Sequence, residues 1–149
     1  GFLIPIYIGL VFQISSFFFN SYRLSTHGGR SVSAISNDQT TGRFINPADY
    51  DSNLGMLFSA GNSGRIMRIK GIKANPENQE AISLNINSEQ ISVVKISPNV
   101  SKRLFIGTGN GNIYRIDSTH LTNMVVTPMN GTFEGNPGSF VSGIDIGSS

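Results

Sequence analysis

Hydrophobic residues in this chain fall into short runs that glycine, asparagine and proline separate, a pattern typical of strands joined by turns. Two of these runs, residues 56–58 and residues 104–106, are apolar at every position. A strand without polar positions is covered on both of its faces. Residues 81–86 alternate apolar and polar side chains instead, which predicts a strand with one face in water. The pattern therefore predicts sheets that pack against neighbours at their centres and meet solvent at their outer strands.

The two apolar runs belong to one internal repeat. Residues 56–69 align without a gap on residues 103–116 at an offset of 47, and six of the fourteen positions are identical. The identical pairs are Leu57/Leu104, Phe58/Phe105, Gly64/Gly111, Ile66/Ile113, Arg68/Arg115 and Ile69/Ile116. Self-similarity at a period of about 40–50 residues, built from strands, indicates the blades of a β-propeller. Glycine and asparagine separate two strand-length runs in each copy, which predicts a tight hairpin.

The repeat predicts an all-β fold, a partial β-propeller with about two four-stranded antiparallel blades and the start of a third. The first blade is expected near residues 42–86 and the second near residues 90–128. The third opens near 140, because residues 142–146 align on residues 92–96 at an offset of 50. A propeller closes with about four to eight blades. We therefore expect a piece of a larger protein, with assembly from several copies as the alternative.

Residues 1–25 precede the predicted propeller at 26–149 and allow three interpretations. The first nineteen residues carry no charge and approach the roughly 20 apolar residues of a membrane span, which suits a membrane or export segment. Pro5 and Gln13 interrupt that stretch, and its phenylalanine and isoleucine content also suits buried strands. The third interpretation is an artefact of the reading frame. The sequence leaves all three open.

The composition narrows the classes of function. Only 13% of the residues are charged, the net charge is +2, and the basic residues are scattered along the chain. Nucleic-acid binding is therefore not expected, because it needs a basic face or stripe. The chain has no cysteine, which excludes disulfides, cysteine zinc sites and thiol nucleophiles.

One motif is similar to the opening of a calcium loop. Asp49, Asp51 and Asn53 place oxygen ligands at alternate positions, as such a loop does. A full loop would have glycine where Leu54 stands and glutamate where Ala60 stands. Aspartate and asparagine also favour turns between strands. Calcium at these three residues is the one metal candidate, and no other cofactor is predicted.

The carboxylates offer no catalytic pair that the sequence can single out. A glycosidase holds two carboxyl groups about 5–10 Å apart. The candidates are Asp38, Asp49, Asp51, Glu89, Asp117, Glu134 and Asp145. Asp145 falls inside a predicted strand, and Lys95 takes the matching position in the preceding unit, so a polar channel lining explains both. No catalytic and no cofactor-binding residue is predicted.

Three further features are expected to be structural. The glycine-rich residues 107–111 lead into a strand rather than a helix, so they predict a hairpin turn and not a phosphate loop. Arg68 and Arg115 recur at equivalent positions and are expected to form an ion pair or to cap neighbouring backbone. His27 and His120 lack metal-spaced partners and are expected in surface loops.

Several stretches carry a family resemblance, namely GRFINPADYD, the hairpin that opens LFSAG, and SPN followed by RLFIGTGNGNIYRI. With them, residues 42–147 resemble secreted bacterial β-propeller proteins of the sortilin-like and BNR-like (sialidase-repeat) group. The resemblance implies export to the cell surface or medium, often with a C-terminal sorting domain of the type IX kind. The Asp-box of true sialidase repeats, S-x-D-x-G-x-T-W, is missing, and the chain has no tryptophan. This departure from the family pattern weighs against sialidase-like activity.

We therefore expect a non-catalytic extracellular β-propeller repeat region, secreted or at the cell surface, that binds or scaffolds. Its expected partner is a polysaccharide or a surface protein. The alternative is a fragment of a propeller glycoside hydrolase, xyloglucanase-like or sialidase-like, whose catalytic carboxylates lie mostly outside this chain. A third interpretation is a propeller that recognises peptides or proteins through its loops. Membrane association is expected only if residues 1–19 are a genuine anchor.

Overall fold

The chain folds into strands, as a computed structural model shows. The structure describes residues 46–71, 78–129 and 140–148 in full, together with the backbone of four earlier strands. Those four are β1 (Ile4–Tyr7), β2 (Gln13–Ser16), β3 (Asn20–Thr26) and β4 (Ser31–Asp38). They form one antiparallel sheet in the order β1-β2-β3-β4.

Two further antiparallel sheets follow along the chain. The second sheet has the order β5-β6-β7-β8 and the third the order β9-β10-β11-β12. The second consists of β5 (Ala48–Asp51), β6 (Met56–Ala60), β7 (Arg65–Lys70) and β8 (Asn78–Ser83). The third consists of β9 (Ile91–Ile96), β10 (Arg103–Thr108), β11 (Ile113–Asp117) and β12 (Val125–Pro128).

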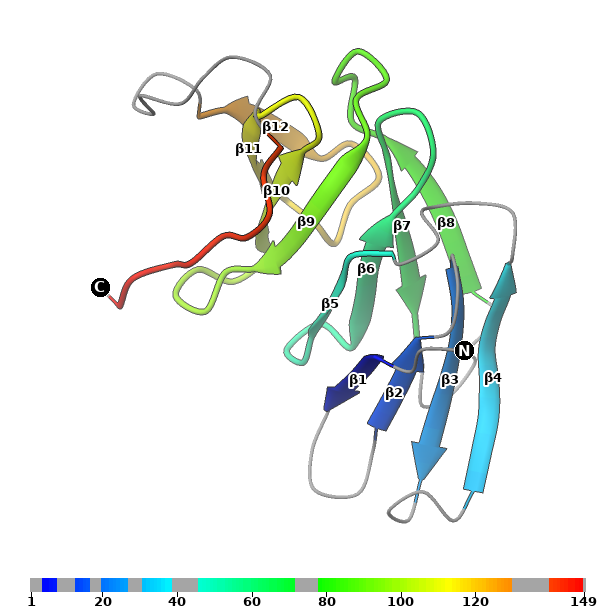
Figure 1. Cartoon of the computed structure of the whole chain (residues 1–149). Coiled ribbons are helices and arrows are strands. Elements are labelled where there is room, and N and C mark those ends of the chain that lie inside the picture. The colour runs from blue at the N-terminus through cyan, green and yellow to red at the C-terminus, as the bar shows by residue number, and fades with distance from the viewer. Residues whose placement is uncertain are drawn as a thin grey trace.

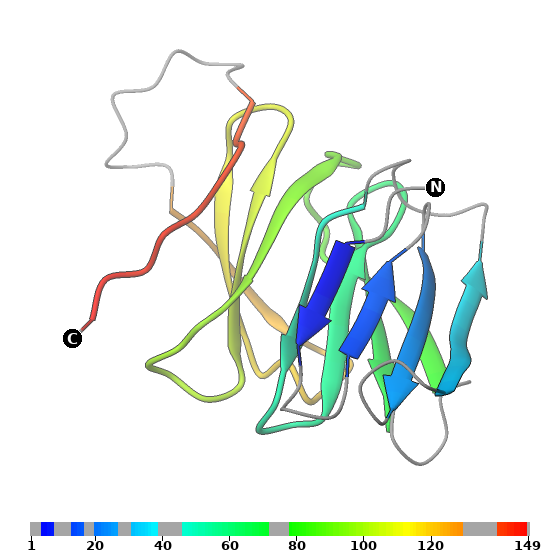
Figure 2. The same ribbon diagram turned by 60° about the horizontal axis from the view of Figure 1, so that its bottom comes forward.

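The three sheets stand side by side like the blades of a propeller (Figures 1 and 2). Within the second and third sheets the chain starts at the inner edge, where β9 lies against β5 and β6. It then moves outward strand by strand to β8 and β12 (Figure 1). The predicted all-β partial propeller is confirmed.

The structure adds a sheet that the repeat did not reveal. The strands β1, β2 and β3 lie within or across the end of the apolar residues 1–25, where the sequence left three interpretations open. Among the residues that the structure describes, no helix is long and apolar enough to cross a membrane.

The outer strand of the second sheet begins earlier than its hydrophobic pattern predicts. The alternation suggested a strand over 81–86, whereas β8 ends at Ser83. Leu84 and Ile86 are buried as the alternation requires, but the backbone turns there, with positive φ at Asn85 (54°) and Asn87 (53°). The pattern identified the buried face correctly, and it placed the end of the strand wrongly because burial continues into the turn.

The hydrophobic core lies between the second and third sheets. One cluster of buried side chains draws members from both. It contains Phe58, Ala60, Ile66, Ile82, Leu84, Ile86, Ile91, Val94, Leu104, Ile106, Tyr114 and Ile116. The repeat-equivalent Leu57 and Leu104 both have no exposed surface. Phe58 of the first apolar run and Leu104 and Ile106 of the second are therefore buried because the neighbouring sheet covers them.

A buried arginine ties the second sheet to the third. Arg68 on β7 is fully buried, and its Nη1 donates to the carbonyl oxygens of Thr119 (2.7 Å) and Leu121 (2.6 Å). These two residues belong to the connection between β11 and β12. The Nη2 atom of Arg68 pairs with Glu80 on β8 at 2.5 Å. The expected ion pair and the expected backbone cap thus both occur at one residue.

The repeat supplies a matched control for this arginine. Arg115 has the same register as Arg68, since each lies opposite its repeat-equivalent phenylalanine, but its side chain is 36% exposed and pairs with Asp117. We expect Arg68→Ala to lower the free energy of unfolding by about 3–5 kcal/mol, because a buried carbonyl, a partly buried carbonyl and a carboxylate lose their common partner. We expect Arg115→Ala to cost less than about 1 kcal/mol. Urea denaturation of both variants measures the difference. Equal losses of unfolding free energy would contradict the conclusion that Arg68 ties the second sheet to the third.

Candidate functional site

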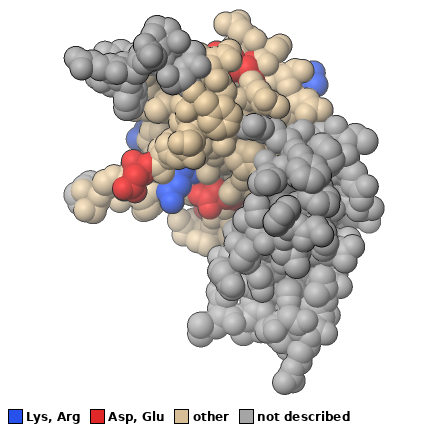
Figure 3. Space-filling view, in the orientation of Figure 1, with Lys and Arg blue, Asp and Glu red and all other residues tan. Residues whose placement is uncertain are grey.

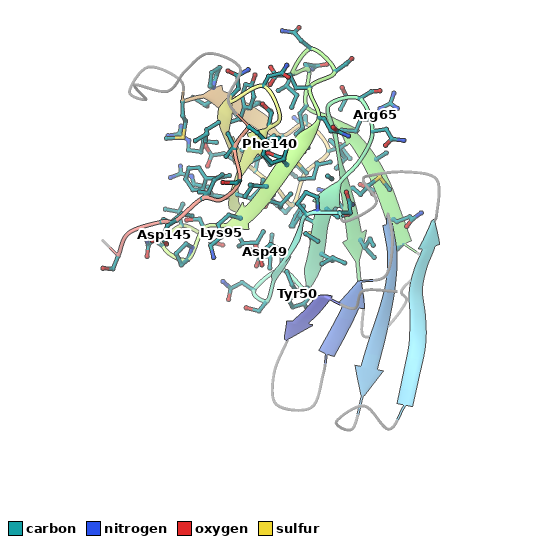
Figure 4. All side chains as sticks on the ribbon, viewed as in Figure 1. Asp49, Tyr50, Arg65, Lys95, Phe140 and Asp145 are labelled. Atoms are coloured by element: carbon teal, nitrogen blue, oxygen red, sulfur yellow. The ribbon has the colours of Figure 1, made fainter. Side chains whose placement is uncertain are left out.

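Three charged residues occupy equivalent positions along the inner edge of the propeller. Asp49 on β5 lies opposite Phe58, and Lys95 on β9 lies opposite the repeat-equivalent Phe105. Asp145 aligns on Lys95 at the offset of 50. Figure 4 shows Asp145, Lys95 and Asp49 following one another from one inner segment to the next. We call these three residues the inner row.

Asp49 has a structural function within the inner row. Its Oδ2 accepts the backbone N–H of Ile96 on β9 at 2.8 Å, and its Oδ1 accepts the N–H of Tyr50 at 2.9 Å. The carboxylate therefore links the innermost strands of the second and third sheets. Burial, with a smaller effect of the Asp51 charge, raises the pKa of the neighbouring Tyr50 phenol.

Lys95 and Asp145 are the members of the inner row that are open to a ligand. Lys95 is half-buried and Asp145 is exposed. Within the described residues neither takes part in an ion pair of 4 Å or less. Acidic and basic atoms alternate over the corresponding part of the surface in Figure 3. The inner row can therefore form ion pairs with a ligand, and it holds no nucleophile with a base beside it.

The three calcium candidates come together only in part. Asp51 is buried, and its Oδ1 accepts the backbone N–H groups of Asn53 and Leu54, each at 3.0 Å. It thus closes the turn between β5 and β6, as aspartate commonly does. Asp49 points instead to β9. Among the described residues, no group of three or more histidine, aspartate or glutamate side chains is placed to hold a metal ion.

A buried carboxylate network was not foreseen from the sequence. Glu89, 7% exposed, lies in the connection between β8 and β9. It accepts bonds from Thr108 Oγ1 (2.6 Å), Asn112 Nδ2 (2.9 Å) and Tyr114 Oη (2.9 Å). These donors sit on both sides of the hairpin of β10 and β11, so Glu89 fixes that hairpin to the connection before it. The only signal in the sequence was a glutamate two residues ahead of an apolar strand.

The network shifts the pKa values of both acids in it. Burial acts to raise the pKa of Glu89, but the hydrogen bonds from Thr108, Asn112 and Tyr114 outweigh it and leave that pKa below its ordinary value. Burial and the adjacent Glu89 raise the pKa of Tyr114 to about 12. Neither group is poised to exchange protons near neutral pH, so the network is structural.

The other candidates are structural or lie outside the described residues. The glycine-rich turn joins β10 to β11, and Gly111 with φ 87° donates to the carbonyl of Thr108 at 3.2 Å. His120 is half-buried in the connection before β12. The side chains of His27, Asp38 and Glu134 are outside the part of the chain that the structure describes.

A groove of about 320 Å³ opens between the outer parts of the second and third sheets. It is lined by Ser83, Leu84, Asn85, Ile86, Tyr114, Met124, Val126 and Pro128. Because this lining carries no group charged at neutral pH, the groove offers neither a catalytic pair nor a metal site.

The comparisons with known proteins support the fold. No protein-family model matches the chain, and no curated protein matches it. The structure is similar to the crystal structure of the WD40 β-propeller domain of Doa1, with a TM-score of 0.58 and 12% sequence identity. The match covers 76% of this chain and 36% of that one. The chain thus spans about a third of the length of that propeller, and the likeness shows the propeller fold alone.

Three carboxylates with lowered pKa values predict how the stability of the fold depends on pH. Hydrogen bonds from Arg68 and Arg103 lower the pKa values of Glu80 and Asp117, and Glu89 is lowered as described above. A carboxyl group with a lowered folded-state pKa stabilises the fold above its unfolded pKa, and this contribution is lost as the pH falls through the folded value. We therefore expect the free energy of unfolding to drop as the pH falls below about 4.5.

The variant Glu89→Gln tests how much the Glu89 carboxylate contributes to the free energy of unfolding and to its dependence on pH. The variant should lose about 2 kcal/mol at pH 7, because its donors lose a charged acceptor, and should show a shallower acid dependence. Asp145→Asn, at an exposed position, is the control and should leave the profile unchanged. Chemical denaturation between pH 3 and pH 7 provides the measurement, and identical profiles for Glu89→Gln and the unmodified chain would show that the network is not formed.

Calcium at Asp49, Asp51 and Asn53 stays a prediction that a titration can decide. Both carboxylates, Asp49 and Asp51, already accept backbone N–H groups. We therefore expect calcium to leave the melting temperature unchanged at about 5 mM, a concentration above the dissociation constants of most extracellular calcium-binding modules. A saturable rise that Asp49→Asn abolishes would instead establish the calcium site.

Proposed function

We propose that this chain is a region of a non-catalytic β-propeller that binds a ligand through its inner row. The observation that carries the proposal is how the carboxylates are used. The structure describes the side chains of six, which are Asp49, Asp51, Glu80, Glu89, Asp117 and Asp145. All of them except Asp145 accept hydrogen bonds or form ion pairs that hold the fold together.

A glycoside hydrolase needs two carboxyl groups facing one cleft, one of them able to give up a proton. Among the described carboxylates only Asp145 is not engaged in such a hydrogen bond or ion pair, so these residues supply no free pair. The glycoside hydrolase alternative therefore draws no support from these residues. A binding function needs only accessible groups that pair with a ligand, and Lys95 and Asp145 meet that need.

The ligand class follows from the two open charges. Lys95 would pair with a carboxylate or sulfate group, and Asp145 would accept hydrogen bonds from hydroxyl groups. An acidic polysaccharide offers both kinds of group in sequence, and a charged segment of a surface protein offers similar chemistry. Secretion or display at the cell surface is part of the proposal and rests on the resemblance to the sortilin-like and BNR-like propellers.

Affinity electrophoresis on polygalacturonate tests the proposal, with a reducing-sugar assay on xyloglucan run in parallel. We expect retardation in the polygalacturonate gel and no sugar release. Lys95→Ala should weaken retention about tenfold, the effect of losing one charged contact. Arg65→Ala is the matched control, because Arg65 is an exposed cation at the hairpin of β6 and β7, away from the inner row (Figure 4).

Unretarded migration would overturn binding to an acidic polysaccharide. Equal effects of Lys95→Ala and Arg65→Ala on retention would show nonspecific charge attraction and would contradict binding through the inner row. Release of reducing sugar would favour the hydrolase instead.

A further inference from the structure

The third sheet carries an extended segment on the face that points away from the second sheet. Residues 140–148 cross in front of β9 and β10 in an irregular, extended course (Figures 1 and 2). The N–H of Val141 donates to the carbonyl of Thr108 at 3.1 Å, and Ser92 Oγ donates to the carbonyl of Val141 at 2.6 Å. Farther along, Asn99 Nδ2 donates to the carbonyl of Gly147 at 2.9 Å.

The face beneath this segment is shaped to receive a branched side chain. A Cβ atom on Gly107 would lie 2.3 Å from Val141 Cγ1 and 2.7 Å from Val141 Cβ, so only glycine leaves room for the valine. The repeat-equivalent residue in the second sheet is Ala60. The third sheet thus has a recess at this place where the second sheet has a methyl group.

The segment uses one side to face the sheet. Val141, Ile144 and Ile146 are half-buried, whereas Ser142, Gly143, Asp145 and Gly147 are exposed. Within the described residues the segment belongs to none of the three sheets, so no ladder of backbone bonds secures it. Side-chain packing and a few separate hydrogen bonds hold it in place. Because no backbone ladder ties it to the sheet, the segment can open locally without unfolding the sheet beneath it.

We propose that this face of β9 and β10 is a peptide-binding slot, which the chain fills with its own residues 140–147. The slot takes an extended peptide from a partner protein when the internal segment leaves. The peptide would carry a small β-branched residue over Gly107, apolar residues at the third and fifth positions after it, and small or polar residues between them. The proposal goes beyond the binding function above, because it names a second site and a different class of ligand, and its test does not involve Lys95.

Hydrogen exchange tests the internal segment first. The Val141 amide should be protected in the unmodified chain and should exchange at least about tenfold faster in Gly107→Ala, because the added methyl group expels the valine. Gly143→Ala is the matched control, since a Cβ there meets nothing within 4 Å. Protection of the β6 and β7 amides reports that the fold is intact. Equal protection of Val141 in both variants would overturn the slot.

Binding in trans uses the full chain with Val141→Asp, which should release its own segment, and a fluorescent peptide with the sequence of residues 140–147. We expect saturable binding by anisotropy, weakened at least about tenfold when Gly107→Val is added to fill the recess. A peptide with aspartate in place of its valine should not bind. Absence of binding to the folded Val141→Asp chain, or equal binding with Gly107→Val present, would overturn the proposal.

The outcomes separate this proposal from the proposed function. Loss of peptide binding with retained polygalacturonate binding removes only the slot. Peptide binding without polygalacturonate binding removes only the inner row as a polysaccharide site.

Discussion

The structure depends on sheets whose apolar faces pack against one another and are thereby buried from water. A central strand such as β6 or β10 contains three consecutive large apolar residues, which point alternately to its two faces, so neither face can be left in water. Stacking sheets face to face is the arrangement that covers both faces at once. The repeat in the sequence, the inner edge where β5 and β9 meet, and the outward order of the strands all follow from this requirement.

Polar groups then fix how one sheet sits on the next. Apolar burial has no direction, whereas a hydrogen bond to a defined backbone group does. Arg68 binds two carbonyl oxygens of the third sheet's outer connection, and Asp49 binds an N–H of its innermost strand. The hydrogen bonds of Arg68 therefore fix the outer side of the interface between the second and third sheets, and the hydrogen bond of Asp49 fixes its inner side. Among the described residues, this use of charge leaves few charged groups free to meet a ligand, and the proposed function rests on two of them.

The features that could be predicted from the sequence are those that lie within a short stretch of the chain and recur in both repeats. The two hairpins were readable because their strands and turns lie within fourteen residues, and the recurrence of Arg68 and Arg115 marked them as structural. The partners of Asp49 and Glu89 were not readable, since Asp49 binds a residue 47 positions away and Glu89 binds donors 19 to 25 positions away. Only the packing of strands brings such groups together. Strands over residues 1–25 were only one of three interpretations, because the segment of the β1–β4 sheet shares no visible repeat with the others.

The most direct test of face-to-face packing compares Phe58→Ala with Phe105→Ala by denaturant unfolding. The two phenylalanines are repeat equivalents, but Phe58 is fully buried under the third sheet and Phe105 is only half-buried on the face beyond it. We expect Phe58→Ala to cost about 3–5 kcal/mol and Phe105→Ala clearly less. Equal losses for the two variants would mean that no neighbouring sheet covers Phe58, and the propeller arrangement would be contradicted.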